Sequence, residues 1–126
     1  MNNESVYQAI GGEATFREVV HRFYQSVRTD DIIGPMYPQQ DWEGAEDRLR
    51  MFLAQYWGGP SDYSEQRGHP RLRMRHAHFR IDSQAAQRWL ELMDEAIDNT
   101  DIAPPQREAL REHMQKVAYM LINTAG

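Results

Sequence analysis

Apolar residues recur every three or four positions along most of the chain, which is the period of a helix with one buried face. A first short helix is predicted around Val6, Tyr7 and Ile10, and the two glycines that follow end it. A second helix is predicted to continue to about Thr29, with an apolar stripe that must face a core. That stripe consists of Phe16, Val19, Val20, Phe23, Tyr24 and Val27.

The helical period breaks between the second and third helices. Gly34, Pro35 and Pro38 predict a turn that holds Tyr37. Asp41 can cap the third helix, because a carboxylate accepts hydrogen bonds from the free N–H groups of a first turn. The predicted apolar face of this helix consists of Trp42, Ala45, Leu49, Phe52, Leu53 and Tyr56.

The middle of the chain is less regular. A Gly-Gly-Pro sequence at 58–60 ends the third helix, and residues 61–68 are polar without a period, which predicts a surface loop. Pro70 is suited to a first helical position, and the segment from Leu72 to Phe79 is predicted to form a short helix at most.

Two longer helices are predicted to complete the chain. Ser83 can cap the first of them, whose inward residues are Ala86, Trp89, Leu90, Met93 and Ile97. Pro104 and Pro105 open the last helix, whose apolar positions are Leu110, His113, Met114, Val117 and Leu121.

No segment alternates convincingly as a strand, and no repeat is present, so the sequence predicts a single all-α domain over residues 1–126. A chain of this length with 40% hydrophobic residues is sufficient for one core.

Composition excludes several classes of function. The formal net charge of −5 opposes general affinity for nucleic acid or an anionic membrane surface. The chain has no cysteine, which excludes disulfides, thiolate metal sites and covalent haem attachment. Its first residues lack the layout of a signal peptide and no apolar run is long enough to span a membrane, so we expect a soluble, cytoplasmic protein.

The stretch from Gly68 to Phe79 carries the most distinctive chemistry. It places His76 among a dense group of arginines in a chain that is otherwise acidic. A neutral imidazole is a good ligand for iron or zinc, and arginine clamps carboxylates. Haem presents an iron atom and two carboxylates. If His76 binds iron, its other ring nitrogen needs an acceptor, and the carbonyl of Leu72 lies one helical turn back.

His78 competes with His76 for this role. Two residues of one helix that are two positions apart differ by about 200° in direction, so only one of them can be the ligand. An HxH pair could bind a non-haem metal from a strand, but the strand pattern is missing here. The ordinary interpretation of a lone histidine is a capping or surface residue, and it applies to His21, His69 and His113.

Three polar aromatic residues interrupt apolar surroundings. Tyr24 lies within the stripe of the second helix, and Tyr37 and Trp89 raise the same question of a hydrogen-bond partner. Singly, each is more often a core aromatic residue than a binding group. Together they supply two O–H donors and one N–H donor, as a diatomic ligand of iron would require on its open side.

The arginines also have several interpretations. Arg67, Arg71, Arg73, Arg75 and Arg80 form a solvated basic face in the ordinary case. Arg48 with one or more of Arg71, Arg73 and Arg75 could instead pair with haem propionates. Binding of nucleic acid is opposed by the net charge and by the scarcity of interleaved aromatic residues.

Over nearly its full length the chain resembles the bacterial truncated haemoglobins of the second, O-type group. The residues that carry this resemblance are Gly11, Gly12, Phe23, Tyr24, Tyr37, the run from Arg48 to Pro60, the run from Tyr63 to His76, and Trp89.

The resemblance implies a two-over-two helical sandwich around haem b, with His76 as the proximal iron ligand and Tyr24, Tyr37 and Trp89 on the distal side. Ala45 falls where many globins carry a distal histidine or glutamine. The predicted lining of the haem pocket is Ala45, Leu49, Phe52, Leu72 and Phe79.

The function implied is reversible binding of oxygen, and of NO and CO, with tight binding and slow release. An enzyme that uses the same haem for nitric oxide dioxygenation or peroxide turnover is the alternative, and a haem-free helical interaction protein is the third hypothesis. Either use of haem for turnover needs an external reductant, since the sequence holds no flavin or nicotinamide module. The sequence does not identify this electron donor, and assembly into a homo-oligomer stays open.

Overall fold

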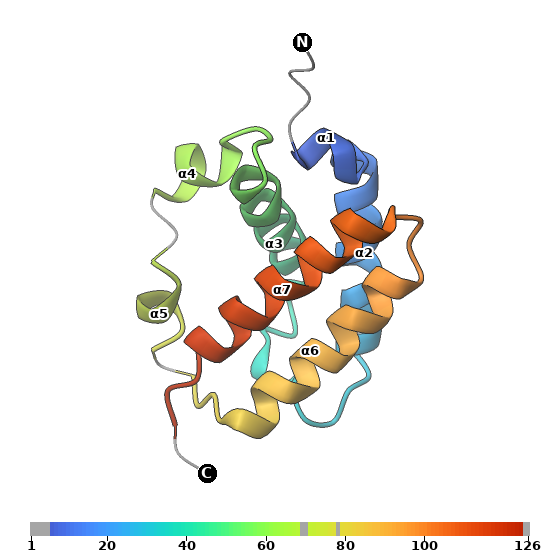
Figure 1. Cartoon of the computed structure of the whole chain (residues 1–126). Coiled ribbons are helices and arrows are strands. Elements are labelled where there is room, and N and C mark those ends of the chain that lie inside the picture. The colour runs from blue at the N-terminus through green and yellow to red at the C-terminus, as the bar shows by residue number, and fades with distance from the viewer. Residues whose placement is uncertain (1–5, 69–70, 78, 125–126) are drawn as a thin grey trace.

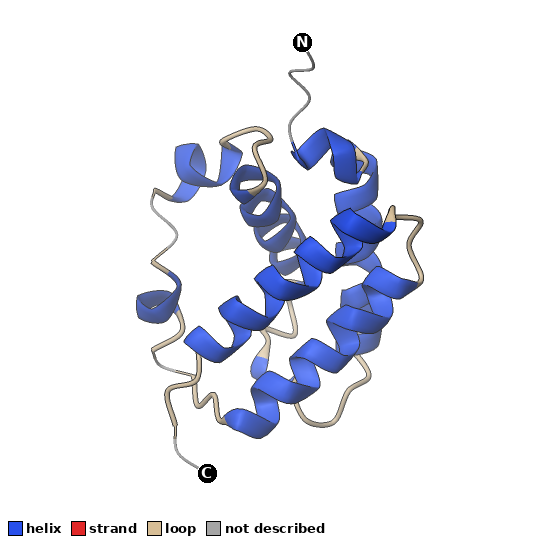
Figure 2. Cartoon of the chain, in the orientation of Figure 1, coloured by secondary structure: helices blue, strands red, loops and turns tan. Residues whose placement is uncertain are grey.

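The computed structural model describes residues 6–68, 71–77 and 79–124, and within these ranges it contains helices and no strand (Figures 1 and 2). The all-α prediction is therefore confirmed. The α-helices are α1 (Val6–Ile10), α2 (Gly12–Val27), α3 (Trp42–Tyr56), α4 (Asp62–Arg67), α5 (Leu72–Arg75), α6 (Ser83–Asp98) and α7 (Pro104–Met120), with one 3₁₀ helix, Gly34–Met36.

The four long helices form the predicted two-over-two sandwich. Helix α2 packs against both α3 and α6, and α6 packs against α7. The interior is built from the apolar stripes of these helices, and its largest fully buried side chains are Phe16, Phe23, Leu53, Met93, Ile97 and Met114. Burial of each such side chain contributes about 1.5–3 kcal/mol. The short helices α4 and α5 both lie at the same side of the sandwich, at different heights (Figure 1).

The boundary between α1 and α2 depends on glycine. Gly11 has a φ of 134°, a backbone angle that residues with a side chain rarely adopt. A Cβ at this position would lie 1.9 Å from the hydroxyl oxygen of Thr15. The chain therefore turns sharply after Ile10, which ends α1, and α2 begins at Gly12. The second helix ends at Val27, two residues earlier than predicted.

The prediction of a surface loop over residues 61–68 is wrong for most of that segment, because Asp62–Arg67 is helix α4. A six-residue helix is too short to show a period, and contacts with the preceding helix stabilise it. The amide of Gln55 on α3 donates to the Ser64 hydroxyl, and its carbonyl oxygen accepts the Ser64 backbone N–H at 2.9 Å. Tyr63 is buried.

Two further details differ from the sequence-based predictions. The residue that caps α6 is Asp82, whose carboxylate accepts the N–H of Ala85 at 2.9 Å, whereas Ser83 is the first residue of the helix. The short helix predicted from Leu72 onward ends at Arg75, and His76 follows as its C-cap. Pro70 and His78 lie outside the described residues.

Helix α7 begins with Pro104 as predicted and ends at Met120, so Leu121 follows it. Within the described part of the chain, no helix combines the length and the apolar character that crossing a membrane requires.

Candidate haem site

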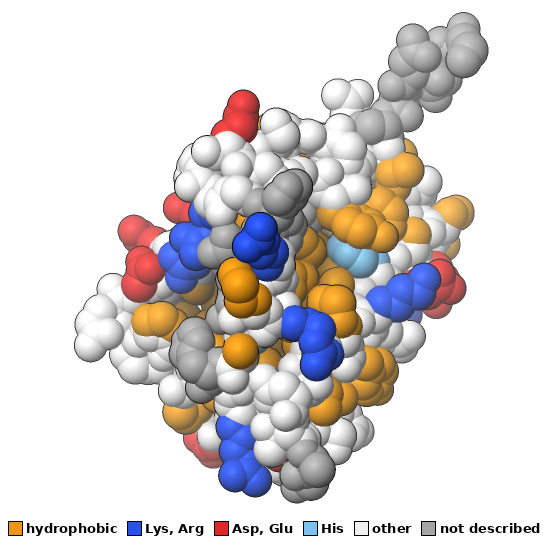
Figure 3. Space-filling view, turned by 90° about the vertical axis from the view of Figure 1, so that its left-hand side faces the viewer, with side chains coloured by type: hydrophobic (Ala, Val, Ile, Leu, Met, Phe, Trp, Pro, Cys, Tyr) orange, Lys and Arg blue, Asp and Glu red, His pale blue; other side chains and the backbone are white. Residues whose placement is uncertain are grey.

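A cavity of about 310 Å³ lies within the sandwich, at the lower end of the range for ligand pockets of about 300–1,000 Å³. Its wall includes residues of α2, α3, α4, α5, α6 and α7. On the face that carries α4 and α5, hydrophobic side chains lie in a hollow among Lys and Arg side chains (Figure 3). The lining residues are Tyr24, Ile33, Met36, Tyr37, Pro38, Ala45, Arg48, Leu49, Phe52, Tyr63, Arg67, Leu72, His76, Phe79, Ile81, Ala85, Ala86, Trp89, Val117, Ala118 and Leu121.

Among the described residues, His76 is the histidine that lines this cavity, and a hydrogen bond orients its ring. Its Nδ1 lies 2.7 Å from the carbonyl oxygen of Leu72, as the helical spacing predicts. A carbonyl oxygen can only accept, so Nδ1 carries a proton, and in the neutral tautomer of this ring Nε2 has the lone pair. A neutral imidazole with a tied Nδ1–H and a free Nε2 is the form that binds a metal.

The segment around His76 is attached to the end of the chain through Asn123. The side-chain amide of Asn123 donates to the carbonyl oxygens of His76 and Phe79, at 3.2 and 2.9 Å. Its side-chain oxygen accepts the N–H of Ile81 at 2.9 Å, and its own N–H donates to the Ile81 carbonyl. These contacts fix the backbone on the C-terminal side of His76. Sequence reasoning missed Asn123, because it lies 47 residues from His76.

Tyr24, Tyr37 and Trp89 meet at another part of the cavity wall. The rings of Tyr24 and Tyr37 have centroids 5.5 Å apart in an edge arrangement, and Phe23 packs edge-on against both Tyr24 and Trp89. The three polar aromatic residues come from α2, from the segment after the 3₁₀ helix, and from α6. The structure therefore brings together the three donors that the sequence singled out.

Burial and hydrogen bonding shift the pKa values of both phenols. Burial raises the pKa of Tyr37, while hydrogen bonds from Trp89 and Tyr24 lower it by a smaller amount. Burial also raises the pKa of Tyr24 well above its ordinary value, and its hydrogen bond to Tyr37 acts in the same direction. Both phenols are therefore protonated at neutral pH, and the Tyr37 hydroxyl has both Trp89 and Tyr24 as hydrogen-bond partners.

The rest of the predicted lining is apolar and is located where the sequence places it. Ala45, Leu49, Phe52, Leu72 and Phe79 all line the cavity. The ring of Phe79 lies 6.2 Å from that of His76.

Comparison with known proteins identifies the family. Residues 5–123 match the family described as Bacterial-like globin. Group 2 truncated hemoglobin YjbI of Bacillus subtilis is 36% identical over 117 residues, which are 93% of this chain and 87% of that protein. The chain belongs to the group II truncated haemoglobins.

Solved structures agree with this assignment. A thermostable hemoglobin from Thermobifida fusca is 47% identical, with a TM-score of 0.92 over 95% of this chain and 98% of that one. A structure described as the truncated oxygen-avid haemoglobin from Bacillus subtilis is 34% identical, with a TM-score of 0.89 over 95% of this chain and all of the other.

The lining of this truncated haemoglobin fits the haem that its family implies. The cavity wall is mainly apolar, as a porphyrin requires, and His76 is the residue that would hold the iron. The Nε2 of His76 has no described hydrogen-bond partner, whereas Nδ1 is tied to Leu72. When bound, haem supplies an iron atom that takes small gaseous ligands.

Arginines border this cavity, but they are not all the predicted ones. Arg48 lines it and also pairs with Asp41 at 3.2 Å. Arg67, which the sequence suggested only as part of a basic face, lines it as well. Arg71 and Arg73 are exposed and are not among the lining residues, and Arg73 donates to the carbonyl of Met120. The side chain of Arg75 lies outside the described part of the structure, so the propionate contacts stay predictions.

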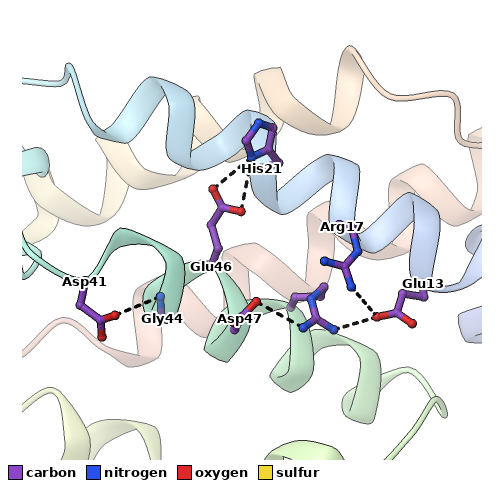
Figure 4. A network of polar contacts seen from close by, with 8 residues as sticks. Glu13, Arg17, His21, Asp41, Gly44, Glu46 and Asp47 are labelled. Atoms are coloured by element: carbon purple, nitrogen blue, oxygen red, sulfur yellow. Dashed lines mark hydrogen bonds and ion pairs between the residues drawn. The ribbon is translucent and has the colours of Figure 1, made fainter.

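The other described histidines of this truncated haemoglobin lie away from the cavity lining. His21 on α2 pairs with Glu46 on α3 at 3.1 Å (Figure 4). His113 on α7 is buried and stacks on Tyr56, with ring centroids 3.6 Å apart. His69 lies outside the described residues. The described ranges contain no group of three or more His, Asp or Glu side chains placed so that they could bind a metal ion.

Proposed function

We propose that this truncated haemoglobin holds haem b through His76, and binds oxygen tightly with slow release. The observation that carries the proposal is that the oriented His76 ring and the Tyr24, Tyr37 and Trp89 group line one cavity. A relative of this architecture, from Bacillus subtilis, is described as oxygen-avid. NO and CO are further ligands of the same site.

The expected affinity follows from the donors in the wall. Oxygen bound to ferrous haem withdraws electron density, so it accepts hydrogen bonds as a partly charged group. A hydrogen bond to a charged acceptor contributes roughly 1.5–3 kcal/mol. Two such bonds, each formed in exchange for a weaker one within the protein, would slow release by up to about a hundredfold, since about 1.4 kcal/mol corresponds to a factor of ten. Slow release suits redox chemistry or sensing better than oxygen delivery.

The role of His76 is tested by substitution. His76→Gly should abolish stable haem binding, measured as the Soret band of the purified protein after haem addition, and added imidazole should restore the band by occupying the vacated space. His21→Ala, which removes an exposed imidazole on α2, is the matched control and should keep the band. A stable Soret band in His76→Gly without imidazole would contradict the assignment.

The distal assignment is tested by oxygen release. Tyr24→Phe and Trp89→Phe each remove one donor while keeping an aromatic ring, and each should accelerate oxygen dissociation about tenfold in stopped-flow measurements. Tyr63→Phe is the matched control, because Tyr63 lines the cavity from α4 outside the Tyr24, Tyr37 and Trp89 group. Unchanged release in both distal variants would show that other groups hold the ligand.

The redox use of the same haem is the second candidate function, either nitric oxide dioxygenation or peroxide turnover. It is favoured by the position of Tyr24, Tyr37 and Trp89 in one cavity wall, which keeps two phenols and an indole beside the cavity. An external reductant is needed in either case. Catalytic consumption of nitric oxide or hydrogen peroxide by the reduced protein, lost in the Tyr24→Phe variant, would support this function, and absence of turnover would leave oxygen binding alone.

A further inference from the structure

Eight arginines lie outside residues 66–81, which we call the α5 segment. Two of them have other partners, since Arg28 lies over the Trp42 ring and Arg107 donates to the carbonyl of Ile102. The other six pair with carboxylates. They are Arg17, Arg22, Arg48, Arg50, Arg88 and Arg111. Figure 4 shows how α2 and α3 neutralise such charges, with Arg17 bonded to Glu13.

The α5 segment is different. Arg71, Arg73 and Arg80 are exposed, and none of them has a carboxylate partner among the described residues. Arg73 donates to a backbone carbonyl, which leaves its charge uncompensated. Met74 between them is 60% exposed. We refer to Arg71, Arg73, Met74 and Arg80 as the α5 patch.

The α5 patch borders the haem cavity. Along the same short segment, Leu72, His76 and Phe79 line the cavity. Each patch residue therefore lies within two sequence positions of a lining residue. The patch therefore covers the outside of the wall whose inside carries the proposed iron ligand. The face that includes α5 shows Lys and Arg side chains around hydrophobic ones (Figure 3).

The charge of the segment is opposite to that of the rest of the molecule. Residues 66–81 contain five arginines and no Asp or Glu, whereas the whole chain has a net charge of −5. The other residues therefore carry −10. An acidic partner is repelled by most of the surface and attracted at this segment, which fixes its orientation as well as its affinity.

We infer that the α5 patch is the docking surface for a small acidic electron-transfer protein that reduces the haem. This inference rests on the proposed function, because a haem that turns over needs an external reductant. In the step, one electron passes from the reduced centre of the partner to ferric iron, so that the partner is oxidised by one electron and the iron becomes ferrous. No bond forms or breaks, and no proton is transferred.

A protein fits the α5 patch better than a polyanion does. Nucleic acid and anionic lipid present extended arrays of charge, which would also meet the acidic surface beyond the patch. An exposed methionine among arginines is the composition that protein interfaces favour. Electron-transfer encounters are small, with less than about 1,200 Å² buried, and a patch of this extent suits them.

The test measures binding of an acidic [2Fe–2S] ferredoxin in its oxidised form to the haem-loaded protein, so that no turnover is involved. Arg71→Asn/Arg80→Gln removes two patch charges. Asn replaces Arg71 because the φ of that residue is 41°, a region that Asn tolerates. Arg73 is left unchanged because it donates a hydrogen bond to the Met120 carbonyl. Arg17→Gln/Arg22→Gln is the matched control, with the same change in net charge on α2.

Wild type and the control should bind this ferredoxin at about 10 mM salt and lose affinity by tenfold or more at about 150 mM, where the Debye length falls from about 30 to about 8 Å. The dissociation constant of the patch variant at low salt should be roughly tenfold higher than that of wild type. Reduction of its haem by reduced ferredoxin, expressed relative to reduction of the same variant by dithionite, should slow by the same factor.

Three results would overturn the docking proposal. These are equal weakening in the two double variants, the absence of salt-dependent ferredoxin binding by wild type, and patch-dependent binding to anionic phospholipid vesicles without binding to ferredoxin. Failure of the proposed function is a separate result, because it would appear as a missing Soret band before any partner is added.

Discussion

His113 is a buried base that the proposed oxygen chemistry does not use. It is 6% exposed, and its Nδ1 atom has no hydrogen-bond partner within the described residues. Tyr56 stacks on its ring and Trp57 packs edge-on at 5.3 Å. Burial, and to a smaller extent the nearby Lys116, lowers the pKa of His113 to about 4. The ring is therefore neutral in the folded protein at physiological pH.

This shift predicts a loss of stability in mild acid. The folded-state pKa of about 4 lies below the ordinary value of 6.5, so the unfolded chain binds more protons between these values. The contribution of neutral His113 to the free energy of unfolding is fully present above pH 6.5. It is lost as the pH decreases toward 4, and the loss reaches roughly 3 kcal/mol. His113→Phe keeps the stacked ring and removes the titration, so its urea midpoint should vary less between pH 7 and pH 4.5.

The matched control is His21→Phe, which replaces an exposed imidazole on α2. It should retain the acid dependence of wild type when both are measured in the same cofactor state. A His113→Phe variant with the acid dependence of wild type would show that other groups cause it.

Single residues could be predicted where the constraint is local. The bond from His76 to the Leu72 carbonyl follows from helical spacing alone, and the structure has it at 2.7 Å. Arg67 and Tyr63 were missed as cavity residues, because their direction depends on α4, which the sequence did not reveal. Asn123 could not be found either, since its partners are set by how the end of the chain returns to α5.

At the level of elements, the start of α6 depends on one carboxylate. Asp82 accepts the N–H of Ala85, which would otherwise be one of the unpaired donors of the first turn. Asp82→Ala should therefore lower the free energy of unfolding by about 0.5–2 kcal/mol, measured by urea denaturation. Ser83→Ala, one residue further on, should change it by less than about 0.5 kcal/mol. The opposite ranking would make Ser83 the cap.

The elements themselves were predictable when they were long. The stripes of α2, α3, α6 and α7 repeat over several turns, which makes the helical period unmistakable. Helix α4 has six residues and a polar sequence, so its existence depends on Gln55 of α3 and on the burial of Tyr63. Propensity alone could not reveal a helix that its tertiary contacts hold.

For the whole molecule, the contacts of Asn123 join the far end of the chain to the wall that holds His76. Asn123→Ala removes hydrogen bonds to the carbonyls of His76 and Phe79 and to the N–H of Ile81. Each contributes about 0.5–1.5 kcal/mol, so we expect haem transfer to a competing apoglobin to accelerate by about tenfold or more.

Asn99→Ala is the matched control, because that amide also bonds to a backbone carbonyl, at the end of α6. It should leave haem transfer unchanged. An equal rate of haem transfer in wild type and Asn123→Ala would show that the His76 wall is held without the end of the chain.

The overall arrangement followed from the sequence only through its resemblance to a family. Apolar stripes predict that four long helices share a core, but they do not say which faces leave a cavity. That cavity is lined from Tyr24 in α2 to Leu121 after α7, so its wall is a property of the assembled sandwich. The net charge of the chain could be calculated from the sequence. Which arginines pair with carboxylates and which do not could be seen only in the structure.

The hydrogen bonds within the distal group imply selectivity among gases. Trp89 donates to the Tyr37 hydroxyl and Tyr24 shares a hydrogen bond with it, so both residues already have a partner inside the protein. A ligand that recruits them must compete with a phenol oxygen. On the proposed function, oxygen accepts hydrogen bonds strongly once it draws charge from haem and should win that competition. Carbon monoxide accepts them weakly and should lose it. Because of these internal hydrogen bonds, a ligand that is a weaker hydrogen-bond acceptor than the phenol oxygen should not be stabilised by Tyr24 or Trp89.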